Sequence, residues 1–348
     1  MERRKPTLAD KMKKSANTPV KKKKKYDGNT EVMISTGSTL LDLAISGGRK
    51  RGGGIPSRIF MEVSGPESSG KSVLLSELAG AIQRQKGTAC FKDPEGTLDE
   101  SFAAIFGMKF DPEQYSKPNT VSQVFQEIRK WEPATPKAIN GIFVDSLAAL
   151  STDLEMDNED GDKMGSRRAK EFSEGFRKSC RLMADNNWLM VASNQIRDKI
   201  GVTFGKKTDT PGGKALKFYA SIRLEFVVIK KIYKEIKIAG ELVKKAIGVE
   251  VLVKVIKNKC WKPFGSCTID IVFNYGIDDI RENLNYIKKY TTNKEYTVGG
   301  VLLGKGIEKA IAKVEHEGLV KDLKNEVIDL WEEIESKFEI TRVKKERD

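Results

Sequence analysis

One eight-residue segment constrains the fold of this 348-residue chain more than any other. Residues 65–72 read GPESSGKS, the pattern G-x-x-x-x-G-K-[ST] of a phosphate-binding loop. The apolar run RIFMEV stands directly before it, and a segment with apolar residues at helical spacing follows directly. Strand, loop and helix is the context that the motif requires, so a chance loop is a poor explanation. We expect a nucleotide site formed by Gly65, Pro66, Glu67, Ser68, Ser69, Gly70, Lys71 and Ser72.

The residue types in this loop suit nucleotide chemistry. Glycines let backbone N–H groups curl round phosphates, and the N-terminus of the next helix favours negative charge. Lys71 is expected to reach the β and γ phosphates, and Ser72 is expected to hold Mg²⁺. The motif therefore predicts ATP and Mg²⁺ as ligands.

Strand-like and helix-like segments alternate along the chain. Apolar runs such as GTACFKD, NGIFVDSLAAL, NWLMVASNQ and SIRLEFVVIKK alternate with amphipathic stretches such as KEFSEGFRKSCRLMADN. This order predicts an α/β fold with a mostly parallel twisted sheet flanked by helices. We expect a disordered basic arm over residues 1–30, the α/β core over residues 31–275, and a small, mostly helical α+β domain over residues 276–348.

The charge is concentrated at the N-terminus. Residues 1–25 hold eleven Lys or Arg against two acidic residues, which is +9 of the formal net charge of +13. Such an arm favours contact with nucleic acid over a merely solvated tail. Four cysteines without C-x-x-C spacing and a single histidine argue against zinc. No apolar run has the roughly 18 residues of a membrane span, and no signal-peptide core is present, so we expect a cytoplasmic protein without membrane contact.

Acidic residues follow two of the expected strands. Asp145 ends an apolar strand beside Ser146, where open α/β sheets bind ligands, so metal coordination is favoured over a helix N-cap. Glu95 follows another strand and could orient a water molecule for attack on the γ-phosphate. Asp93 competes for this role, and the spacing alone does not choose between them.

The motifs together resemble a known family. GPESSGKS, DPEGTLD, IFVDSLAAL, NQIRDKIGVTFG and PGGKALKFYASIRL resemble the bacterial and phage RecA recombinases in order and spacing, from about Ser35 to about Tyr275. The resemblance implies a RecA-like P-loop ATPase core that polymerises on single-stranded DNA and exchanges strands with a homologous duplex in recombination and repair. It also implies a homo-oligomeric helical filament with ATP between subunits, in a bacterial or phage-infected cytosol. A single-strand-binding protein and a loader protein are further partners that it allows.

The resemblance also implies roles for individual residues. It chooses Glu95 over Asp93 as the residue that activates the hydrolytic water, beside Lys71, and it makes Asp145 and Ser72 the Mg²⁺ ligands. The other implied positions are Gln195 as γ-phosphate sensor, Asp99 and Phe102 at the adenine, Lys257 and Lys259 at the neighbouring subunit's nucleotide, and Phe218 at the subunit interface.

Two segments resemble the family's DNA-binding loops, at about residues 155–165 and 196–213. Cations that track phosphates, apolar wedges and flexible glycines suit a stretched single strand read without sequence preference. A mobile solvated connection is the alternative for each. The candidate DNA-binding residues are Met164, Arg167, Arg168, Arg177, Arg197, Lys199, Ile200, Phe204, Gly212 and Gly213.

The chain also departs from the family. The usual N-terminal packing segment is not recognisable, the loop GGRKRGGG is longer and more basic, and TRVKKERD replaces an acidic tail, which predicts less autoinhibition. The alternative function is a RecA-fold helicase or a strand-annealing recombination mediator, which would share Lys71, Ser72 and Asp145. Neither is expected to carry the second loop and the GGKALKFYAS block. A non-catalytic DNA-binding filament would leave Glu95 and Gln195 idle.

Overall fold

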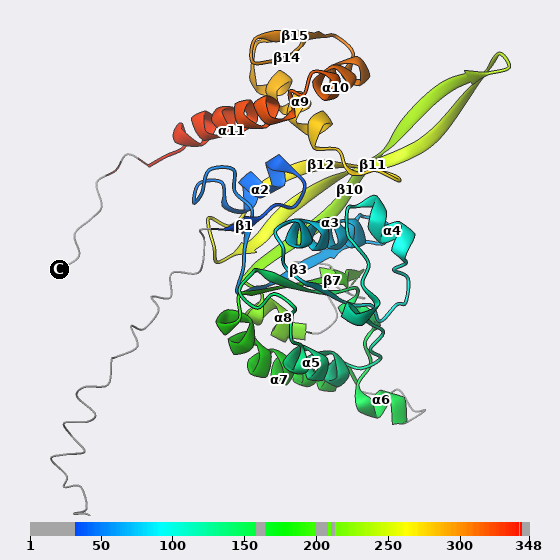
Figure 1. Cartoon of the computed structure of the whole chain (residues 1–348), viewed down its shortest axis with the longest axis vertical. Helices are drawn as coiled ribbons and strands as arrows, with labels where there is room; N and C mark the ends of the chain where they lie inside the picture. Colours follow the sequence, from blue (N-terminus) through cyan, green and yellow to red (C-terminus); the bar gives the residue numbers. More distant parts are fainter. Residues whose placement is uncertain (1–31, 158–163, 199–207, 210–212, 341, 343–348) are drawn as a thin grey trace, which may run out of the picture.

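A computed structural model describes residues 32–157, 164–198, 208–209, 213–340 and 342. Figure 1 shows an α/β body, a small domain beside it, and a long hairpin that projects away from both. The body is organised by a nine-stranded sheet. Its strands in spatial order are β13 (Gly276–Ile277), β12 (Ser266–Val272), β11 (Glu241–Asn258), β10 (Ile222–Ile238), β3 (Ile59–Gly65), β7 (Trp188–Gln195), β6 (Asn140–Val144), β4 (Ala89–Lys92) and β5 (Tyr115–Ser116).

The sheet has a parallel part and an antiparallel part. Strands β10, β3, β7, β6, β4 and β5 pair in parallel. Strands β10 to β13 pair antiparallel. Almost every residue of β3, β6 and β7 is buried, as expected for parallel strands that are covered on both faces. The predicted mostly parallel α/β fold is confirmed, and the antiparallel extension is a feature that the sequence pattern did not indicate.

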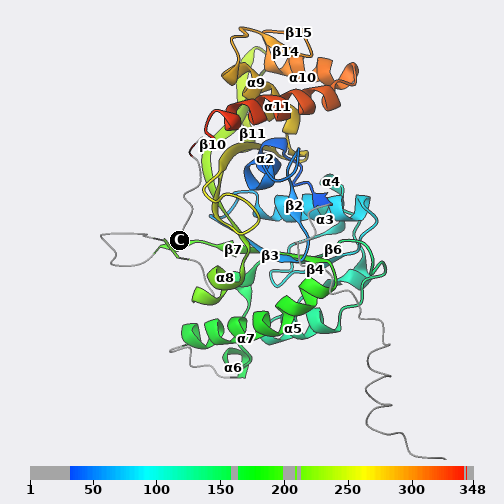
Figure 2. The same ribbon diagram turned by 90° about the vertical axis from the view of Figure 1, so that its left-hand side faces the viewer.

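Helices cover both faces of the parallel part, as Figure 2 shows. One face packs on α3 (Lys71–Arg84), through Leu74, Leu75 and Leu78. The other face packs on α5 (Val121–Lys130), α7 (Met164–Asp185) and α8 (Gly213–Tyr219). There Phe176 lies between Phe60 of β3 and Phe125 of α5, with ring centroids 4.4 and 4.9 Å away. Two apolar layers thus fix the sheet, and with it the ends of its strands.

The C-terminal part forms a domain with its own apolar core. Its elements are α9 (Asp279–Tyr290), β14 (Tyr296–Val298), β15 (Val301–Gly304), α10 (Ile307–His316) and α11 (Val320–Ser336). Leu284, Val314 and Val327 are buried together there, and Leu43 of α2 (Thr39–Ser46) enters the same cluster. Strand β13, although it lies beyond residue 275, still pairs with β12 in the main sheet. Helix α2 therefore joins the small domain to the body.

The hairpin formed by β10 and β11 is unusually long. The two strands pair from Ile222 opposite Asn258 to Ile238 opposite Glu241. Ala239 and Gly240 make the turn, both with positive φ (50° and 90°), which matches the twist of a two-residue hairpin loop. The sequence pattern predicted one strand here, which ended near Lys231. None of the helices in the described ranges is both long and apolar enough to cross a membrane.

Candidate functional site

The phosphate-binding loop joins the end of β3 to the start of α3. Gly70 precedes the helix with φ +87°, a left-handed conformation that favours glycine. No described side chain caps α3, and its first turn holds no acidic residue, so the first N–H groups can face an anion. Lys71 Nζ donates to the carbonyl oxygens of Gly65 (3.1 Å) and Pro66 (2.6 Å). The lysine is therefore folded over the loop, at the place where phosphates would lie.

Burial and neighbouring charges act in opposite directions on the pKa of Lys71. Desolvation lowers the pKa of this ammonium group, while the negative charges of Asp145, Glu95 and Glu67 oppose the shift. These three carboxylates must therefore lie near the lysine. The loop thus combines a partly desolvated cation with an open helix N-terminus, which fits the phosphates of a nucleotide.

Asp145 lies directly after β6 and faces the loop. Its carboxylate accepts hydrogen bonds from the hydroxyls of Ser193 and Ser72. Burial raises the pKa of Asp145, and the neighbouring charges of Glu95 and Asp93 raise it further. A desolvated carboxylate beside a hydroxyl and other acids suits a hard divalent cation, because such a cation prefers oxygen ligands and would stabilise the ionised form. The donor set of Asp145 and Ser72 therefore fits Mg²⁺.

Asp93 and Glu95 have different surroundings. Asp93 is buried and accepts the backbone N–H groups of Gly96 (2.9 Å) and Leu98 (2.8 Å). It also accepts the hydroxyl of Tyr115 (2.8 Å), whose pKa is raised by burial and by the Asp93 charge. Asp93 therefore holds the loop after β4 in place.

Glu95 lies exposed on that loop. Its Oε1 accepts the hydroxyl of Ser146 at 2.6 Å, and Ser146 is the neighbour of Asp145. The carboxylate is thus positioned at the edge of the site while it stays accessible to water. The spacing in the sequence did not choose between Asp93 and Glu95, but their contacts in the fold differ. Glu95 is therefore the candidate for activating water.

Gln195 is the last residue of β7 and lies directly opposite Gly65 of β3 in the parallel register. The second proposed DNA loop begins one residue later. Gln195 therefore stands between the first residue of the phosphate loop and that segment. Its role as a γ-phosphate sensor stays a prediction.

A buried ion pair beneath the loop was missed by the sequence analysis. Glu62 of β3 is fully buried, and its carboxylate accepts Arg223 Nε at 2.5 Å and Asn194 Nδ2 at 3.0 Å. These residues come from β3, β10 and β7, three neighbouring strands. Charged residues inside the apolar runs FMEVSG and SIRLEF were the signal that could have found it.

Lys257 contacts its own chain. Its Nζ donates to the carbonyl oxygens of Lys217 (2.6 Å) and Phe218 (3.0 Å) at the end of α8. Burial lowers the pKa of Lys257, and the positive charges of Lys259 and Arg223 lower it further. The side chain of Phe218 is 71% exposed. The roles expected for Lys257, Lys259 and Phe218 toward a neighbouring subunit need that subunit and stay predictions.

The two residues expected at the adenine belong to the start of α4 (Glu100–Ile105). Asp99 is its N-cap and accepts the backbone N–H of Phe102 at 2.6 Å, which lowers the pKa of this carboxyl. The ring of Phe102 packs edge-on against Phe106, with centroids 4.8 Å apart. Both residues thus have a local structural role, and their contact with adenine stays a prediction.

The first expected DNA loop is partly helical. Residues Asp153–Asp157 form α6, and α7 already begins at Met164, so both ends of the range 155–165 are helical. Residues 158–163 lie outside the described residues. Arg168 binds Glu155 at 3.0 Å and Arg167 approaches Glu171 at 3.6 Å, which partly neutralises both arginines, while Arg177 is exposed. The side chain of Met164 lies outside the described residues.

The second expected DNA loop is described only at its ends. Arg197 lies in β8 (Arg197–Asp198), which pairs with β9 (Thr208–Asp209), and Gly213 begins α8 with φ +64°. Lys199, Ile200, Phe204 and Gly212 lie outside the described residues, as does the arm of residues 1–30.

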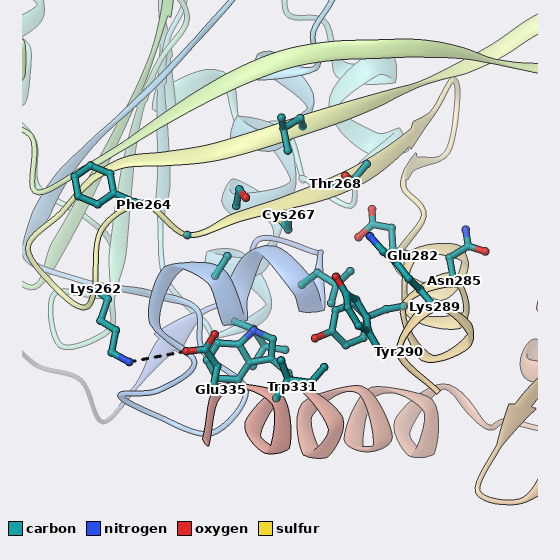
Figure 3. Close-up of a pocket in the computed structure, with 18 of the residues that line it drawn as sticks. Lys262, Phe264, Cys267, Thr268, Glu282, Asn285, Lys289, Tyr290, Trp331 and Glu335 are labelled. Carbon is teal, nitrogen blue, oxygen red and sulfur yellow. Dashed lines mark ion pairs between the residues drawn. The ribbon is translucent and has the colours of Figure 1, made fainter. Parts of the chain in front are cut away.

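A cavity of about 850 Å³ lies away from this site, between the body and the small domain. Figure 3 shows Tyr290 of α9 and Trp331 of α11 beside the hollow, with the ion pair of Lys262 and Glu335 (3.9 Å) at one side. The nucleotide site is instead recognised by its chemistry at the carboxyl ends of β3, β4, β6 and β7.

Comparison with known proteins shows the family of this chain. A family model described as the RecA N-terminal domain matches residues 7–278. The chain is 36% identical over 304 residues to Protein RecA of Thermus thermophilus, covering 85% of each chain. It is 35% identical over 306 residues to Protein RecA of Delftia acidovorans, covering 85% of this chain and 78% of the relative. Protein RecA of Legionella pneumophila is 39% identical over 252 residues, which is 72% of this chain and 68% of the relative.

Proposed function

The chain belongs to the RecA family, and from this premise we propose that it is an ATP-dependent DNA recombinase. It polymerises on single-stranded DNA as a homo-oligomeric filament and catalyses homologous pairing and strand exchange with a duplex. The observation that carries the proposal is the meeting of Lys71, Glu95 and the pair of Ser72 and Asp145 at one edge of the parallel sheet.

Each of these residues has a defined task in ATP hydrolysis. Lys71 stabilises the negative charge on the transferring phosphoryl group, since it is folded over the loop. Ser72 and Asp145 would hold Mg²⁺, which supplies charge neutralisation on the phosphate oxygens when bound. Glu95, oriented by Ser146, accepts the hydrogen bond of the attacking water and positions it in line with the γ-phosphate.

The nucleotide state reaches the DNA through the strand that carries Gln195. Its position opposite Gly65, one residue before the range 196–213, supports coupling between the γ-phosphate and the proposed DNA loop. In the filament, Lys257, Lys259 and the exposed Phe218 meet the neighbouring subunit, with ATP between protomers. Asp99 and Phe102 contact the adenine. ATP binding, more than hydrolysis, sets the filament state that pairs DNA.

The test is strand exchange between circular single-stranded DNA and homologous linear duplex, beside ATP hydrolysis measured with and without DNA. Joint molecules together with DNA-dependent hydrolysis support the recombinase. Hydrolysis without joint molecules would instead favour the helicase or the strand-annealing mediator.

Substitution of Glu95 tests the assignment of the water-activating group. Glu95→Gln is expected to lower kcat by about 10²- to 10⁴-fold, the usual contribution of a positioned acid or base, while ATP-dependent DNA binding persists. Glu100→Gln, the same change on an exposed residue of α4, is the matched control and should leave hydrolysis unchanged. Lys71→Ala should lose nucleotide binding and tight DNA binding together. Unchanged hydrolysis in Glu95→Gln would show that another group activates the water.

A further inference from the structure

The cavity of about 850 Å³ lies where the body meets the small domain. Its walls come from α2, from β11, β12 and the segment between them, and from α9 and α11. Trp261 of the segment between β11 and β12, Tyr290 of α9 and Trp331 of α11 line it, and Figure 3 shows the last two beside the hollow. A pocket of roughly 300–1,000 Å³ with aromatic walls and a few polar groups is the usual form of a small-molecule site.

Two acidic residues lie opposite each other on the sheet wall of this cavity. Glu250 of β11 pairs directly with Asp270 of β12 in the antiparallel register, and both line the cavity. Like charges directly opposite each other destabilise a sheet. Lys230 neutralises Glu250 at 2.8 Å. Among the residues that the structure describes, no ion pair or hydrogen bond involves the carboxylate of Asp270, although this residue is only 8% exposed.

The other acids of the cavity already have donors. Glu282 of α9 accepts Ser38 Oγ and the backbone N–H of Asp270, each at 2.8 Å. Glu335 of α11 faces Lys262 at 3.9 Å, and both of these side chains are well exposed, so the pair is weak and easily exchanged. Asp270 is therefore the carboxylate of this lining that, within the described ranges, lacks a donor.

Asp270 carries a negative charge at neutral pH. Burial, and then the charge of Glu250, raises its pKa to about 6. The charge of Arg281 lowers this pKa in part, but Arg281 is already held in ion pairs with Asp278 (2.8 Å) and Glu308 (2.9 Å). The carboxylate is thus ionised at pH 7.5 while its lost hydration is only partly compensated. A cation that entered the cavity would supply the missing charge.

The aromatic rings of the cavity suit ammonium groups. Lys289 Nζ lies 5.1 Å from the ring centroid of Tyr290, and Lys262 Nζ lies 5.5 Å from that of Trp261. In the described part of the chain no lysine or arginine lies over Trp331. The face of this indole is therefore open to a cation from outside, and tryptophan is the ring that attracts cations most strongly.

We propose that the cavity binds a linear polyamine, with one ammonium group at Asp270 and another at Glu335. Figure 3 shows Glu335 and Glu282 on opposite sides of the hollow, and Glu282 accepts the backbone N–H of Asp270, so the two acids lie at separate ends. Tyr290 and Trp331 lie between them and can contact the methylene groups and the inner charge of the ligand.

A metal ion fits this cavity less well than an organic cation. No group of three or more His, Cys, Asp or Glu side chains in the described ranges could hold a metal. A bound polyamine would join Asp270 on the main sheet to Trp331 and Glu335 on α11, and so hold the small domain against the body. The inference goes beyond the proposed function and does not depend on it.

The test measures binding of spermidine to the full chain, free of nucleic acid, by isothermal titration calorimetry at pH 7.5. Because the chain carries a net charge of +13, diffuse attraction of a polycation is not expected. Asp270→Asn should weaken binding by about 10- to 100-fold, the usual contribution of a hydrogen bond to a charged group. Asp322→Asn, the same change on an exposed residue of α11 outside the cavity, is the matched control and should leave binding unchanged. Equal affinities of the two variants, or a Kd of the unaltered chain weaker than about 1 mM, would overturn the proposal.

Three further measurements test the chemistry of the site. Trp331→Leu should weaken spermidine binding by about 3- to 10-fold if the indole contacts the cation. Spermidine should raise the urea midpoint of the unaltered chain more than that of Asp270→Asn, because a ligand that binds the folded state stabilises it. Hexane-1,6-diamine should compete with spermidine and hexane-1,6-diol should not. Competition by the diol, or complete displacement of spermidine by millimolar Mg²⁺, would show an apolar or a divalent site and contradict the proposal.

Discussion

Arg223→Met tests whether the fold under the phosphate loop depends on the buried ion pair. The substitution keeps the length and apolar stem of the side chain but removes the charge that neutralises Glu62. In the intact protein Glu62 is fully buried and holds Arg223 at 2.5 Å, with Asn194 at 3.0 Å as a further donor. The variant therefore leaves a carboxylate inside the sheet without its cation.

The size of the effect follows from the burial of both partners. Removing one member of a buried pair costs about 3–5 kcal/mol, because the remaining charge keeps its desolvation penalty. Arg223 is 11% exposed at its side chain, so solvent can relieve little of this penalty and the expected loss lies within that range. Removing both charges in Glu62→Gln with Arg223→Met should restore most of the stability. The new amide oxygen can still accept from Asn194, so the double variant should lose only about 1 kcal/mol.

The assay is urea unfolding followed by circular dichroism, with the midpoint and slope compared among the three proteins. An unchanged slope with a lower midpoint in Arg223→Met, and recovery in the double variant, would support the reasoning. A loss below about 1 kcal/mol in the single variant would refute it. A double variant as unstable as the single one would also refute it, because packing and not charge would then explain the loss.

Two other changes probe packing and titration. Gly175→Ala places a Cβ 2.1 Å from the Phe125 ring between α5 and α7, so unfolding free energy should fall by about 1–3 kcal/mol, whereas Gly306→Ala, which meets open space, should change it little in the same urea assay. Burial, and then the charge of Glu250, raises the pKa of Asp270 from 3.8 to about 6. The folded protein thus binds this proton more tightly than the unfolded chain, and the associated stability is present below about pH 4 and lost as pH rises through 6. Asp270→Asn should therefore be more stable than the parent by on the order of 1–2 kcal/mol at pH 7.5, after allowance for solvent screening, with the difference vanishing near pH 4; an equal gain at both pH values would contradict the titration.

The sequence predicted the nucleotide site because the phosphate-loop motif and its flanking segments specify the local backbone structure. The sequence from RIFMEV through Lys71 and Ser72 dictates a strand, a glycine turn and an open helix N-terminus, and all three are found. The choice between Asp93 and Glu95 could not come from spacing. Asp93 is held by the backbone N–H groups of Gly96 and Leu98 and also by Tyr115, which lies 22 residues later in the chain and donates a hydrogen bond to it.

The long hairpin shows why other parts escaped the sequence pattern. A regular alternation of apolar and polar residues arises where one face of a strand is buried. The outer part of this hairpin, from Ile229 to Ile247, is mostly exposed on both faces, so its sequence shows no such alternation. Its register is set by the buried inner residues and by the turn at Ala239 and Gly240. The first proposed DNA loop differs from expectation only at its ends, and its role toward DNA stays a prediction. Thr152 and Glu155 exchange hydrogen bonds that start α6, although the acidic composition had suggested a connection.

Residues that act between subunits pose a separate problem. Lys257 is satisfied within one chain by the carbonyls that end α8, so its geometry alone gives it the role of a helix C-cap. Those carbonyls belong to Lys217 and to Phe218, which is exposed and whose ring packs edge-on against that of Tyr219. A neighbouring subunit that covered Phe218 would lie within reach of Lys257, whose lowered pKa reflects partial burial beside two other cations. A nucleotide phosphate placed there would relieve that repulsion. The single-chain contacts and the intersubunit role are thus compatible, because the end of α8 both carries Phe218 and accepts the hydrogen bonds of Lys257.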